Sequence, residues 1–353
     1  MTYINRFCAD VGTVNCPCPL AETGDCLICS RLSGKEKCDC GWAGVCIYNE
    51  YIQNDGIIRN RRKNEVVPIL KKIRYGEDII VIVLKVSRGF ALTAAQPGSF
   101  VFINSTNKSD FSNLPISVMK ADVEKEQIWL ALKIISGKTK AIAEEKDSLM
   151  LRGVYRSGIL GEGTASLAED VGIKKVQNRE QSRRKKWLVI TKGIGFAPAV
   201  NLLRWAGGRT DADIVIDTEK VGEEIIRDYL KTEEISSDKD EHISIEMASL
   251  QEAVNSFSRE NRHGRGKLLL GKYSADFYDR VIIFTSDYYI SVLAEAMDIP
   301  SHKIVFCNNF RMCCGEGICG ACSHFCGKDK VDKMCKCREI DVMELCGYPD
   351  KKF

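Results

Sequence analysis

Residues 311–322 read Arg-Met-Cys-Cys-Gly-Glu-Gly-Ile-Cys-Gly-Ala-Cys. Within them, Cys314, Cys319 and Cys322 follow the C-x4-C-x2-C spacing that is typical of [2Fe–2S] loops. Glycine lets a backbone approach a cluster closely and adopt positive φ, and three glycines separate these cysteines: Gly315, Gly317 and Gly320. A zinc site more often has two C-x2-C knuckles and does not need this glycine density. The stretch therefore predicts a [2Fe–2S] cluster, with zinc as the alternative.

A [2Fe–2S] cluster needs a fourth thiolate, and three downstream cysteines are candidates: Cys326, Cys335 and Cys337. Cys335 fits best, because the gap after Cys322 allows a hairpin before the chain returns to the cluster. Cys313 is expected to be a bystander, since using it would leave Cys314 outside the spacing. We therefore predict Cys314, Cys319, Cys322 and Cys335 as ligands, with Cys337 and Cys326 left open.

The other cysteines lie mainly at the opposite end of the chain. Of 17 cysteines, eight fall in residues 8–46 and nine in residues 307–346, and there are only 4 histidines, so any metal sites must be nearly all-thiolate. Paired C-x-C and C-x2-C turns can each present two thiolates to one metal. The amino-terminal cysteines predict one or two [4Fe–4S] clusters, or zinc in a docking module, and a segment that folds only with metal. These predicted ligands are Cys8, Cys16, Cys18, Cys26, Cys29, Cys38, Cys40 and Cys46.

Composition and charge restrict the class of protein. A chain of 353 residues with 44% hydrophobic and 28% charged residues is an ordinary globular protein of two or three domains. A net charge of +3 is too small to indicate nucleic-acid binding. We find no apolar run of the roughly 18 residues that a membrane span needs, and no apolar signal-peptide region. The sequence therefore predicts a cytoplasmic protein without a membrane span.

The periodicity of the sequence predicts an α+β chain of several domains. Short Val- and Ile-rich runs at 77–86, 98–104, 115–121, 127–135 and 147–154 predict an antiparallel β-barrel. Strand and helix patterns then alternate from residue 186 to about 297, which predicts a parallel α/β sheet. The expected domains are a Cys-rich module at 1–60, the barrel at 61–173, a nucleotide-binding-type α/β domain at 174–300 and a [2Fe–2S] module at 301–353.

This order of a barrel, an α/β unit and a carboxy-terminal thiol loop resembles the ferredoxin-reductase superfamily over residues 65–340. Within it, the chain most resembles the electron-transfer subunit of NAD-linked dihydroorotate dehydrogenases. It also resembles the small subunits of flavin-based bifurcating transhydrogenases. The resemblance implies an FAD-binding barrel that exchanges electrons with NAD(P)H or a partner flavin and passes them through the [2Fe–2S] cluster.

The resemblance places FAD on short segments of the barrel domain. Residues 97–100 resemble the family's P-G-Q-F turn, and residues 114–117 stand where the family has Arg-Pro-x-Ser, with Leu114 in place of the pyrophosphate-binding arginine. Residues 137–140 resemble a segment that opens a helix, whose N-terminus suits a pyrophosphate. The implied FAD contacts are Pro97, Gly98, Phe100, Pro115, Ile116, Ser117, Gly137, Lys138, Thr139, Lys140, Gly153 and Tyr155.

The resemblance also implies a pyridine-nucleotide site after the strand at 186–191. Gly193, Gly195 and Pro198 match the family's G-G-x-G-I-A-P turn, but its first glycine is Lys192 here. The family's C-G-P-x-x-M element is replaced by Phe-Thr-Ser-Asp-Tyr at 284–288. We therefore predict weak or no NAD(P) binding by the isolated chain.

No acid, base or nucleophile constellation stands out, so substrate chemistry is expected to belong to another chain. The sequence predicts an electron-transfer subunit that works with catalytic oxidoreductase subunits and, as a further candidate partner, a ferredoxin. The alternatives are an autonomous NAD(P)H:ferredoxin oxidoreductase and a zinc-stapled regulatory protein on a degenerate reductase scaffold. The basic runs at 59–63 and 174–186 are expected to be solvated linkers or a docking surface for an acidic partner.

Overall fold

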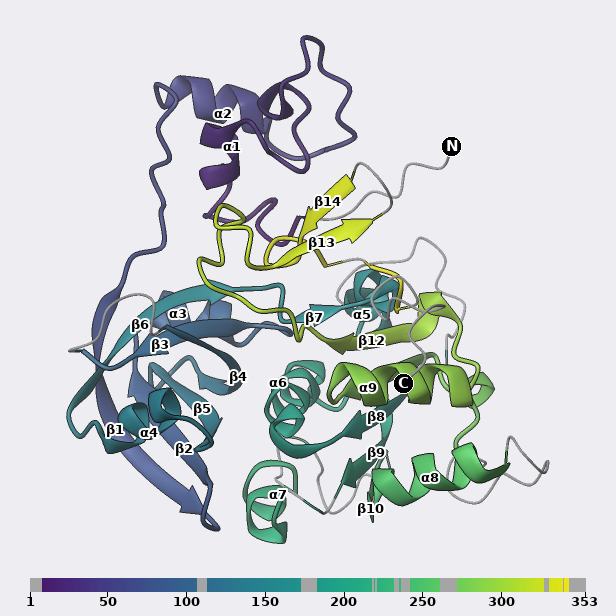
Figure 1. Cartoon of the computed structure of the whole chain (residues 1–353). Helices are drawn as coiled ribbons and strands as arrows, with labels where there is room; N and C mark the ends of the chain where they lie inside the picture. Colours follow the sequence, from purple (N-terminus) through teal and green to yellow (C-terminus); the bar gives the residue numbers. More distant parts are fainter. Residues whose placement is uncertain are drawn as a thin grey trace.

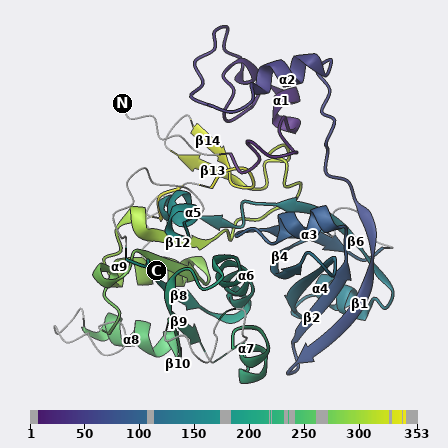
Figure 2. The same ribbon diagram turned by 180° about the vertical axis from the view of Figure 1, so that it is seen from behind.

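The computed structural model describes residues 8–106, 113–172, 183–217, 219, 221–231, 235, 242–260, 272–326, 330–338 and 340–342. The β-barrel and the α/β domain lie side by side, and the carboxy-terminal segment lies across them (Figure 1). The amino-terminal segment sits on that carboxy-terminal segment, on the side away from the α/β sheet, as the reverse view also shows (Figure 2).

The barrel consists of six strands in the closed order β1-β2-β5-β4-β3-β6, and every pair is antiparallel. The strands are β1 (Glu65–Tyr75), β2 (Ile79–Lys85), β3 (Phe100–Asn104), β4 (Leu114–Asp122), β5 (Gln127–Lys133) and β6 (Ser148–Tyr155). Helix α3 (Arg88–Ala94) precedes β3, and α4 (Gly137–Glu144) precedes β6. The predicted antiparallel barrel is confirmed. The sequence showed no alternating apolar pattern for strand β1, because its side chains are mostly exposed. Its pairing with β2 and β6 closes the barrel.

The second domain is a six-stranded sheet in the order β10-β9-β8-β11-β12-β7. Strands β8 (Lys186–Thr191), β9 (Asp211–Asp217), β10 (Ile243–Ala248), β11 (Arg280–Phe284) and β12 (Ile304–Cys307) are parallel. The edge strand β7 (Ile159–Leu160) is antiparallel to β12 and directly follows the barrel, so it ties the two domains together. The helices are α5 (Leu167–Asp170), α6 (Phe196–Ala206), α7 (Glu223–Tyr229), α8 (Leu250–Glu260) and α9 (Asp287–Ala296). The predicted parallel α/β arrangement is confirmed.

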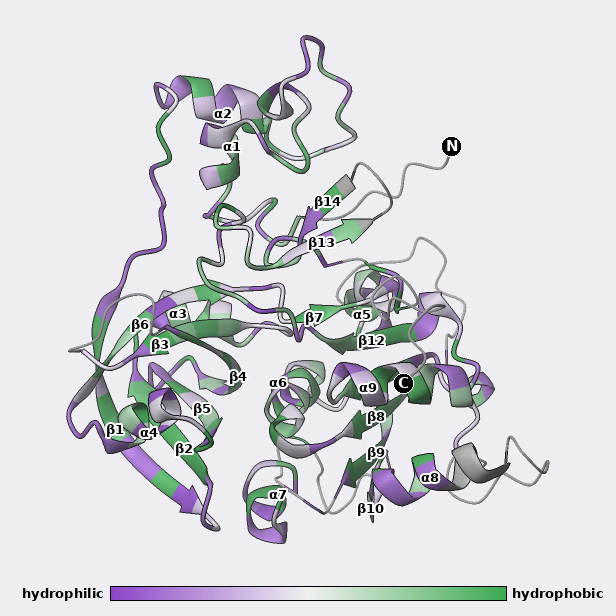
Figure 3. Cartoon of the chain, viewed as in Figure 1, coloured by the Kyte–Doolittle hydropathy of each residue, from purple (hydrophilic) through white to green (hydrophobic). Residues whose placement is uncertain are grey.

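Figure 3 shows that the strands of both domains are largely hydrophobic, as buried strands require, whereas much of the segment leading from α2 to β1 is hydrophilic. In the described ranges, no helix has the length and apolar character needed to cross a membrane.

The amino-terminal and carboxy-terminal segments contact each other. The amino-terminal segment contains α1 (Pro19–Thr23), a 3-10 turn (Arg31–Ser33) and α2 (Ile47–Gln53). The carboxy-terminal segment contains the hairpin of β13 (Ser323–Cys326) and β14 (Lys330–Lys333). Cys8 and Cys337 are antiparallel bridge partners, and the Ala9 amide donates a 2.7 Å hydrogen bond to the Lys336 carbonyl. The predicted Cys-rich segments at the two ends are therefore in direct contact.

Candidate functional site

A cavity of about 330 Å³ opens where the barrel, the α/β domain and the carboxy-terminal segment converge. The barrel supplies Phe100, Pro115, Ser117 and Gly158. The α/β domain and the segment after it supply Lys192, Ile194, Gly195, Pro198, Thr285, Ser286, Cys307, Asn308, Asn309, Phe310 and Met312. The Cys307 thiol donates a 2.9 Å hydrogen bond to the Thr285 carbonyl, and burial raises the pKa of Cys307 to about 12. The aromatic, thioether and hydroxyl groups that line the cavity suit a flat, partly polar ring system.

One wall of this cavity leads directly to the carboxy-terminal thiol loop. Phe100 lines the cavity, and the ring of Tyr155 stacks on it with centroids 5.1 Å apart. On its other side, the Tyr155 hydroxyl donates to the Cys314 carbonyl at 3.4 Å. Met312, also a lining residue, is two positions before Cys314 and packs against the same aromatic cluster. Phe100 and Tyr155 thus connect the cavity to the backbone of the thiol loop.

The thiols of Cys314, Cys319, Cys322 and Cys335 lie together. The thiols of Cys314 and Cys322 both hydrogen-bond with the Cys335 thiol, and the Cys319 thiol hydrogen-bonds with that of Cys314. The hydrogen bond with Cys335 lowers the pKa of Cys314. Backbone amides also point at these sulfurs. The amides of Glu316 and Cys319 donate to the Cys314 Sγ at 3.3 and 3.5 Å, and the Cys335 amide donates to the Cys322 Sγ at 3.4 Å. Convergent thiols with N–H donors to sulfur are the donor set that a [2Fe–2S] cluster uses.

Cys335 reaches this group because its own backbone is held in place. The buried Ser157 hydroxyl donates to the Cys335 carbonyl at 2.8 Å, and Asn308 bridges the carbonyls of Ser157 and Met334. Cys313 is exposed. The side chain of Cys326 lies outside the described residues. Within those residues, no group of three or more His, Cys, Asp or Glu side chains is arranged as a metal site, so the iron–sulfur assignment stays a prediction.

The glycines of the loop have the positive φ that the sequence predicted: +70° at Gly315, +80° at Gly317 and +76° at Gly320. Two of them also allow close packing. A Cβ on Gly315 would lie 2.5 Å from the Tyr155 ring, and one on Gly317 would lie 2.8 Å from Leu20 of α1. The loop is therefore held between the barrel and the amino-terminal segment, where a side chain at either glycine would not fit.

The predicted flavin residues divide into two groups. Phe100, Pro115 and Ser117 line the cavity. The turn at 97–98 contacts the cavity wall, because the amide of the lining residue Gly158 donates a 2.9 Å hydrogen bond to the Gly98 carbonyl. Residues 137–140 do not line it; they form the start of α4, where Ser136 and Thr139 cap each other. Gly153 packs against Val101, and Ile116 pairs with Val101 across the β3–β4 ladder.

Lys192 changes the predicted nucleotide site. Gly195 and Pro198 line the cavity, as expected for that turn, and Gly193 begins a 3-10 turn. The Lys192 ammonium makes ion pairs with Asp217 at 2.7 Å and Glu219 at 2.9 Å. Asp217 is fully buried. An acidic residue at the end of a strand of such a sheet can accept a hydrogen bond from a ribose hydroxyl, and here Lys192 already pairs with both carboxylates.

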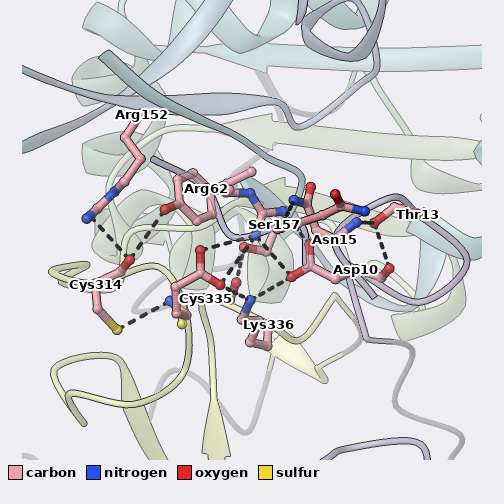
Figure 4. A network of polar contacts seen from close by, with 12 residues as sticks. Asp10, Thr13, Asn15, Arg62, Arg152, Ser157, Cys314, Cys335 and Lys336 are labelled. Atoms are coloured by element: carbon pink, nitrogen blue, oxygen red, sulfur yellow. Dashed lines mark hydrogen bonds and ion pairs between the residues drawn. The ribbon is translucent and has the colours of Figure 1, made fainter. Parts of the chain in front are cut away.

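A buried network of four charged side chains joins the amino-terminal and carboxy-terminal segments to Arg62, shortly before barrel strand β1 (Figure 4). Arg62 and Lys336 each pair with both Asp10 and Glu316; the Lys336 ammonium is 2.6 Å from an oxygen of each carboxylate. The side chains of Arg62, Lys336 and Asp10 are 3%, 1% and 4% exposed. Burial alone would raise the pKa of Asp10, but the charges of Lys336 and Arg62 outweigh it and lower this pKa to about 2.

Sequence reasoning missed this network because its members lie in three separate segments. Arg62 belongs to the basic run at 59–63, which was expected to be solvated. Instead it is buried, it donates a 2.8 Å hydrogen bond to the Val154 carbonyl, and its guanidinium lies 4.4 Å from the Tyr155 ring centroid. Most of the second basic run, at 174–186, lies outside the described residues. The sequence carried no signal for the network, because a basic residue looks alike whether it is solvated or matched by a buried carboxylate.

The amino-terminal cysteines include two neighbouring pairs. The Cys29 amide donates to the Cys26 Sγ at 3.3 Å, and the thiols of Cys38 and Cys40 are 3.9 Å apart. A small hydrophobic core that includes Cys29, Leu32 and Ile47 packs beneath them.

No protein-family model and no curated protein matches this chain. Among solved structures, the NADH-dependent reduced ferredoxin–NADP oxidoreductase, described in work on flavin-based electron bifurcation, aligns with a TM-score of 0.51 and 17% identity. The alignment covers 79% of this chain and 89% of that one. The chain has the ferredoxin-reductase fold.

Two further solved structures align less well. A ferredoxin NADP+ reductase from Neisseria gonorrhoeae with bound FAD and NADP has a TM-score of 0.47 and 14% identity, over 70% of this chain and 99% of that one. The ferredoxin reductase in carbazole 1,9a-dioxygenase has a TM-score of 0.47 and 13% identity, over 73% of each chain. At such identities the likeness concerns the fold. The narrower resemblance to dihydroorotate dehydrogenase subunits stays a prediction.

Proposed function

We propose that this chain is an FAD- and [2Fe–2S]-containing electron-transfer subunit of a larger oxidoreductase. The observation that carries the proposal is the shared wall between the cavity and the thiol loop. Phe100 and Met312 line the cavity, and Tyr155 and Cys314 continue the contact into the group of four thiols. A ring bound in the cavity would therefore be linked to a thiolate-held cluster through the stacked rings of Phe100 and Tyr155.

The lining residues fit a flavin ring, and the four thiols fit a [2Fe–2S] cluster. Phe100 and Pro115 offer apolar contact, and Ser117 offers a hydroxyl to a ring edge. When bound, a flavin exchanges electrons in pairs or singly, and a [2Fe–2S] cluster carries one at a time. Tyr155 and Arg152 hold the loop against the barrel, since both donate to the Cys314 carbonyl. The start of α4 is the proposed pyrophosphate position.

A partner protein can approach the thiol loop from solvent. Cys319 is exposed, and the neighbouring Ile318 is 53% exposed. A catalytic oxidoreductase subunit or a ferredoxin docking here would lie beside a cluster ligand. Lys192 favours a protein partner over free NAD(P)H as the route for electrons, because it already neutralises Asp217 and Glu219.

The test is to purify the full chain anaerobically, extract its flavin, and record the electron paramagnetic resonance spectrum after reduction. The expected result is FAD together with a reduced [2Fe–2S] signal. Cys319→Ser should abolish that signal, whereas Cys313→Ser, the matched control at an exposed cysteine beside the same loop, should retain it. A preparation without flavin and without this signal would refute the proposal. Steady NADH oxidation by the isolated chain would show an autonomous reductase instead.

A further inference from the structure

A second cavity, also of about 330 Å³, is lined by residues of both the barrel domain and the α/β domain. Helix α6 packs against strand β4 of the barrel, and the cavity lies along this contact. The lining residues are Ala95 at the end of α3, Lys120 and Ala121 of β4, and Asn201, Arg204 and Trp205 of α6. None of them lines the cavity proposed for the flavin, so the two cavities are separate sites.

Asn201 brings a buried oxygen without a partner to this cavity. The residue is 3% exposed, and its side-chain nitrogen donates a 3.2 Å hydrogen bond to the carbonyl of Ala94 in α3. Because a backbone carbonyl can only accept, this bond fixes which way the side-chain amide points. Among the described residues, no donor reaches the Asn201 Oδ1. A buried acceptor without a donor is costly, so this oxygen indicates a ligand that carries a donor.

The charged side chains that line the cavity are both cationic. Lys120 and Arg204 are partly buried, and burial lowers the pKa of each. The Lys120 ammonium lies 5.0 Å from the centroid of the Trp129 ring. Asp122 is the neighbouring carboxylate that opposes the two cations, but it pairs with the Lys125 ammonium at 3.6 Å and accepts a 2.9 Å hydrogen bond from the Lys125 amide. The lining groups therefore favour an anion.

The carbonyl end of α6 is close to these cations, and a helix end of this kind carries partial negative charge on its unsatisfied carbonyls. Here Arg209 satisfies two of them. Its Nε donates to the Ala206 carbonyl at 2.7 Å, and its Nη2 donates to the Trp205 carbonyl at 2.5 Å. The helix end is thus already matched by a cation of its own, and Arg204 is left to act on the cavity.

We propose that this cavity binds a small oxyanion that carries a hydroxyl group, of which hydrogen phosphate is the simplest. The anionic oxygens contact Lys120 and Arg204, and the hydroxyl donates to the Asn201 Oδ1. A hydroxyl fits this donor role better than an ammonium, because two cations line the same cavity. The site needs neither flavin nor metal, so it goes beyond the proposed function and does not depend on it.

Such a ligand would touch both domains at once. Lys120 belongs to β4 and Arg204 to α6, and the same two elements contribute Ser117 and Pro198 to the flavin cavity. An anion held between Lys120 and Arg204 would therefore stabilise the contact between the barrel and the α/β domain on which that cavity also depends.

The experiment measures the binding of four anions to the full chain by isothermal titration calorimetry at neutral pH. Hydrogen phosphate has a hydroxyl, and sulfate is an oxyanion of similar size without one. Lactate has a hydroxyl, and propionate is the same carboxylate without it. The wild-type protein should bind phosphate about tenfold more tightly than sulfate, because only phosphate satisfies the buried oxygen. A preference for lactate over propionate also supports the site and identifies a hydroxycarboxylate as its ligand.

Three variants separate the roles of the residues. Asn201→Leu should lose the preference for the hydroxylated anion and keep its affinity for sulfate. Arg204→Met should bind both phosphate and sulfate about tenfold more weakly. Arg227→Met is the matched control, since Arg227 is an arginine on α7, 69% exposed, that does not line the cavity, and it should bind as the wild type does. Melting temperatures without added anion show that each variant is folded, and Asn201→Ser replaces Asn201→Leu if the latter is not.

Two results would overturn the inference. The first is that neither hydroxylated anion binds more tightly than its partner without a hydroxyl. The second is that Arg204→Met binds the anions as tightly as Arg227→Met does, which would mean that they bind elsewhere on the surface. Both results leave the proposed function untouched, because flavin and iron are measured separately on the same preparation.

Discussion

Replacing Lys336 by methionine tests the buried network that links the amino-terminal and carboxy-terminal segments. Lys336 is 1% exposed and lies 2.6 Å from both Asp10 and Glu316. Methionine has a similar length but no charge. The variant would leave two carboxylates, one of them almost fully buried, sharing the single remaining cation, Arg62.

The expected cost follows from the burial of the pair. Removing one partner of a buried ion pair destabilises a protein by about 3–5 kcal/mol, because the charge left behind is uncompensated. Arg62 still contacts both carboxylates, so we expect about 3 kcal/mol, at the lower end of this range. An exposed ion pair costs at most about 1 kcal/mol to remove. Arg88–Glu124, with side chains 66% and 77% exposed, is such a pair.

Native-state hydrogen exchange measures this cost locally, at the Ala9 amide that bonds to the Lys336 carbonyl. In Lys336→Met this amide should exchange about 100-fold faster, since each 1.4 kcal/mol corresponds to a factor of ten. Arg88→Met, the matched control, should leave it unchanged. A double-mutant cycle with Asp10→Asn should show a coupling of about 1–3 kcal/mol. Additive effects of the two substitutions, or a Lys336→Met effect no larger than that of Arg88→Met, would show that the network is not energetically coupled.

Three further predictions concern the loop, the α/β sheet and the nucleotide site. Gly315→Ala should destabilise the protein by about 1–3 kcal/mol more than Gly172→Ala, because both have φ near +70° but only Gly315 faces an aromatic ring; equal melting temperatures would contradict this. Burial would raise the pKa of Asp213, but its hydrogen bonds with Lys186, Ser244 and Tyr278 outweigh burial and lower this pKa below the ordinary value of 3.8. The ionised carboxylate therefore stabilises the folded protein at pH values above 3.8, and this stability is lost as the pH falls through the lower pKa of the folded state. Asp213→Asn should flatten the acid limb of unfolding below about pH 4, and an unchanged limb would disprove the assignment. Lys192→Gly should tighten NADH binding by about tenfold, because it frees the carboxylates of Asp217 and Glu219. Titration with NADH, followed by flavin absorbance, measures this affinity, and an unchanged affinity would contradict the prediction.

Local sequence patterns were enough to predict the β-barrel, the α/β sheet and the spacing of the carboxy-terminal thiol loop. Alternating Val- and Ile-rich runs marked β2 to β6, and the strand–helix alternation marked β8, β9 and β11 with their helices. The spacing of Cys314, Cys319 and Cys322 lies within one short segment, and the structure places these thiols together with that of Cys335.

The contacts between residues far apart in the sequence could be seen only in the folded chain. The pairing of Cys8 with Cys337, the burial of Arg62 among carboxylates, and the ion pairs of Lys192 each join segments far apart in the chain. Such contacts leave no periodicity in the sequence, and a basic residue looks alike whether it is solvated or matched by a buried carboxylate. Their outcome depends on which charged and thiol groups folding removes from water together, because a buried charge is stable only beside its counter-charge.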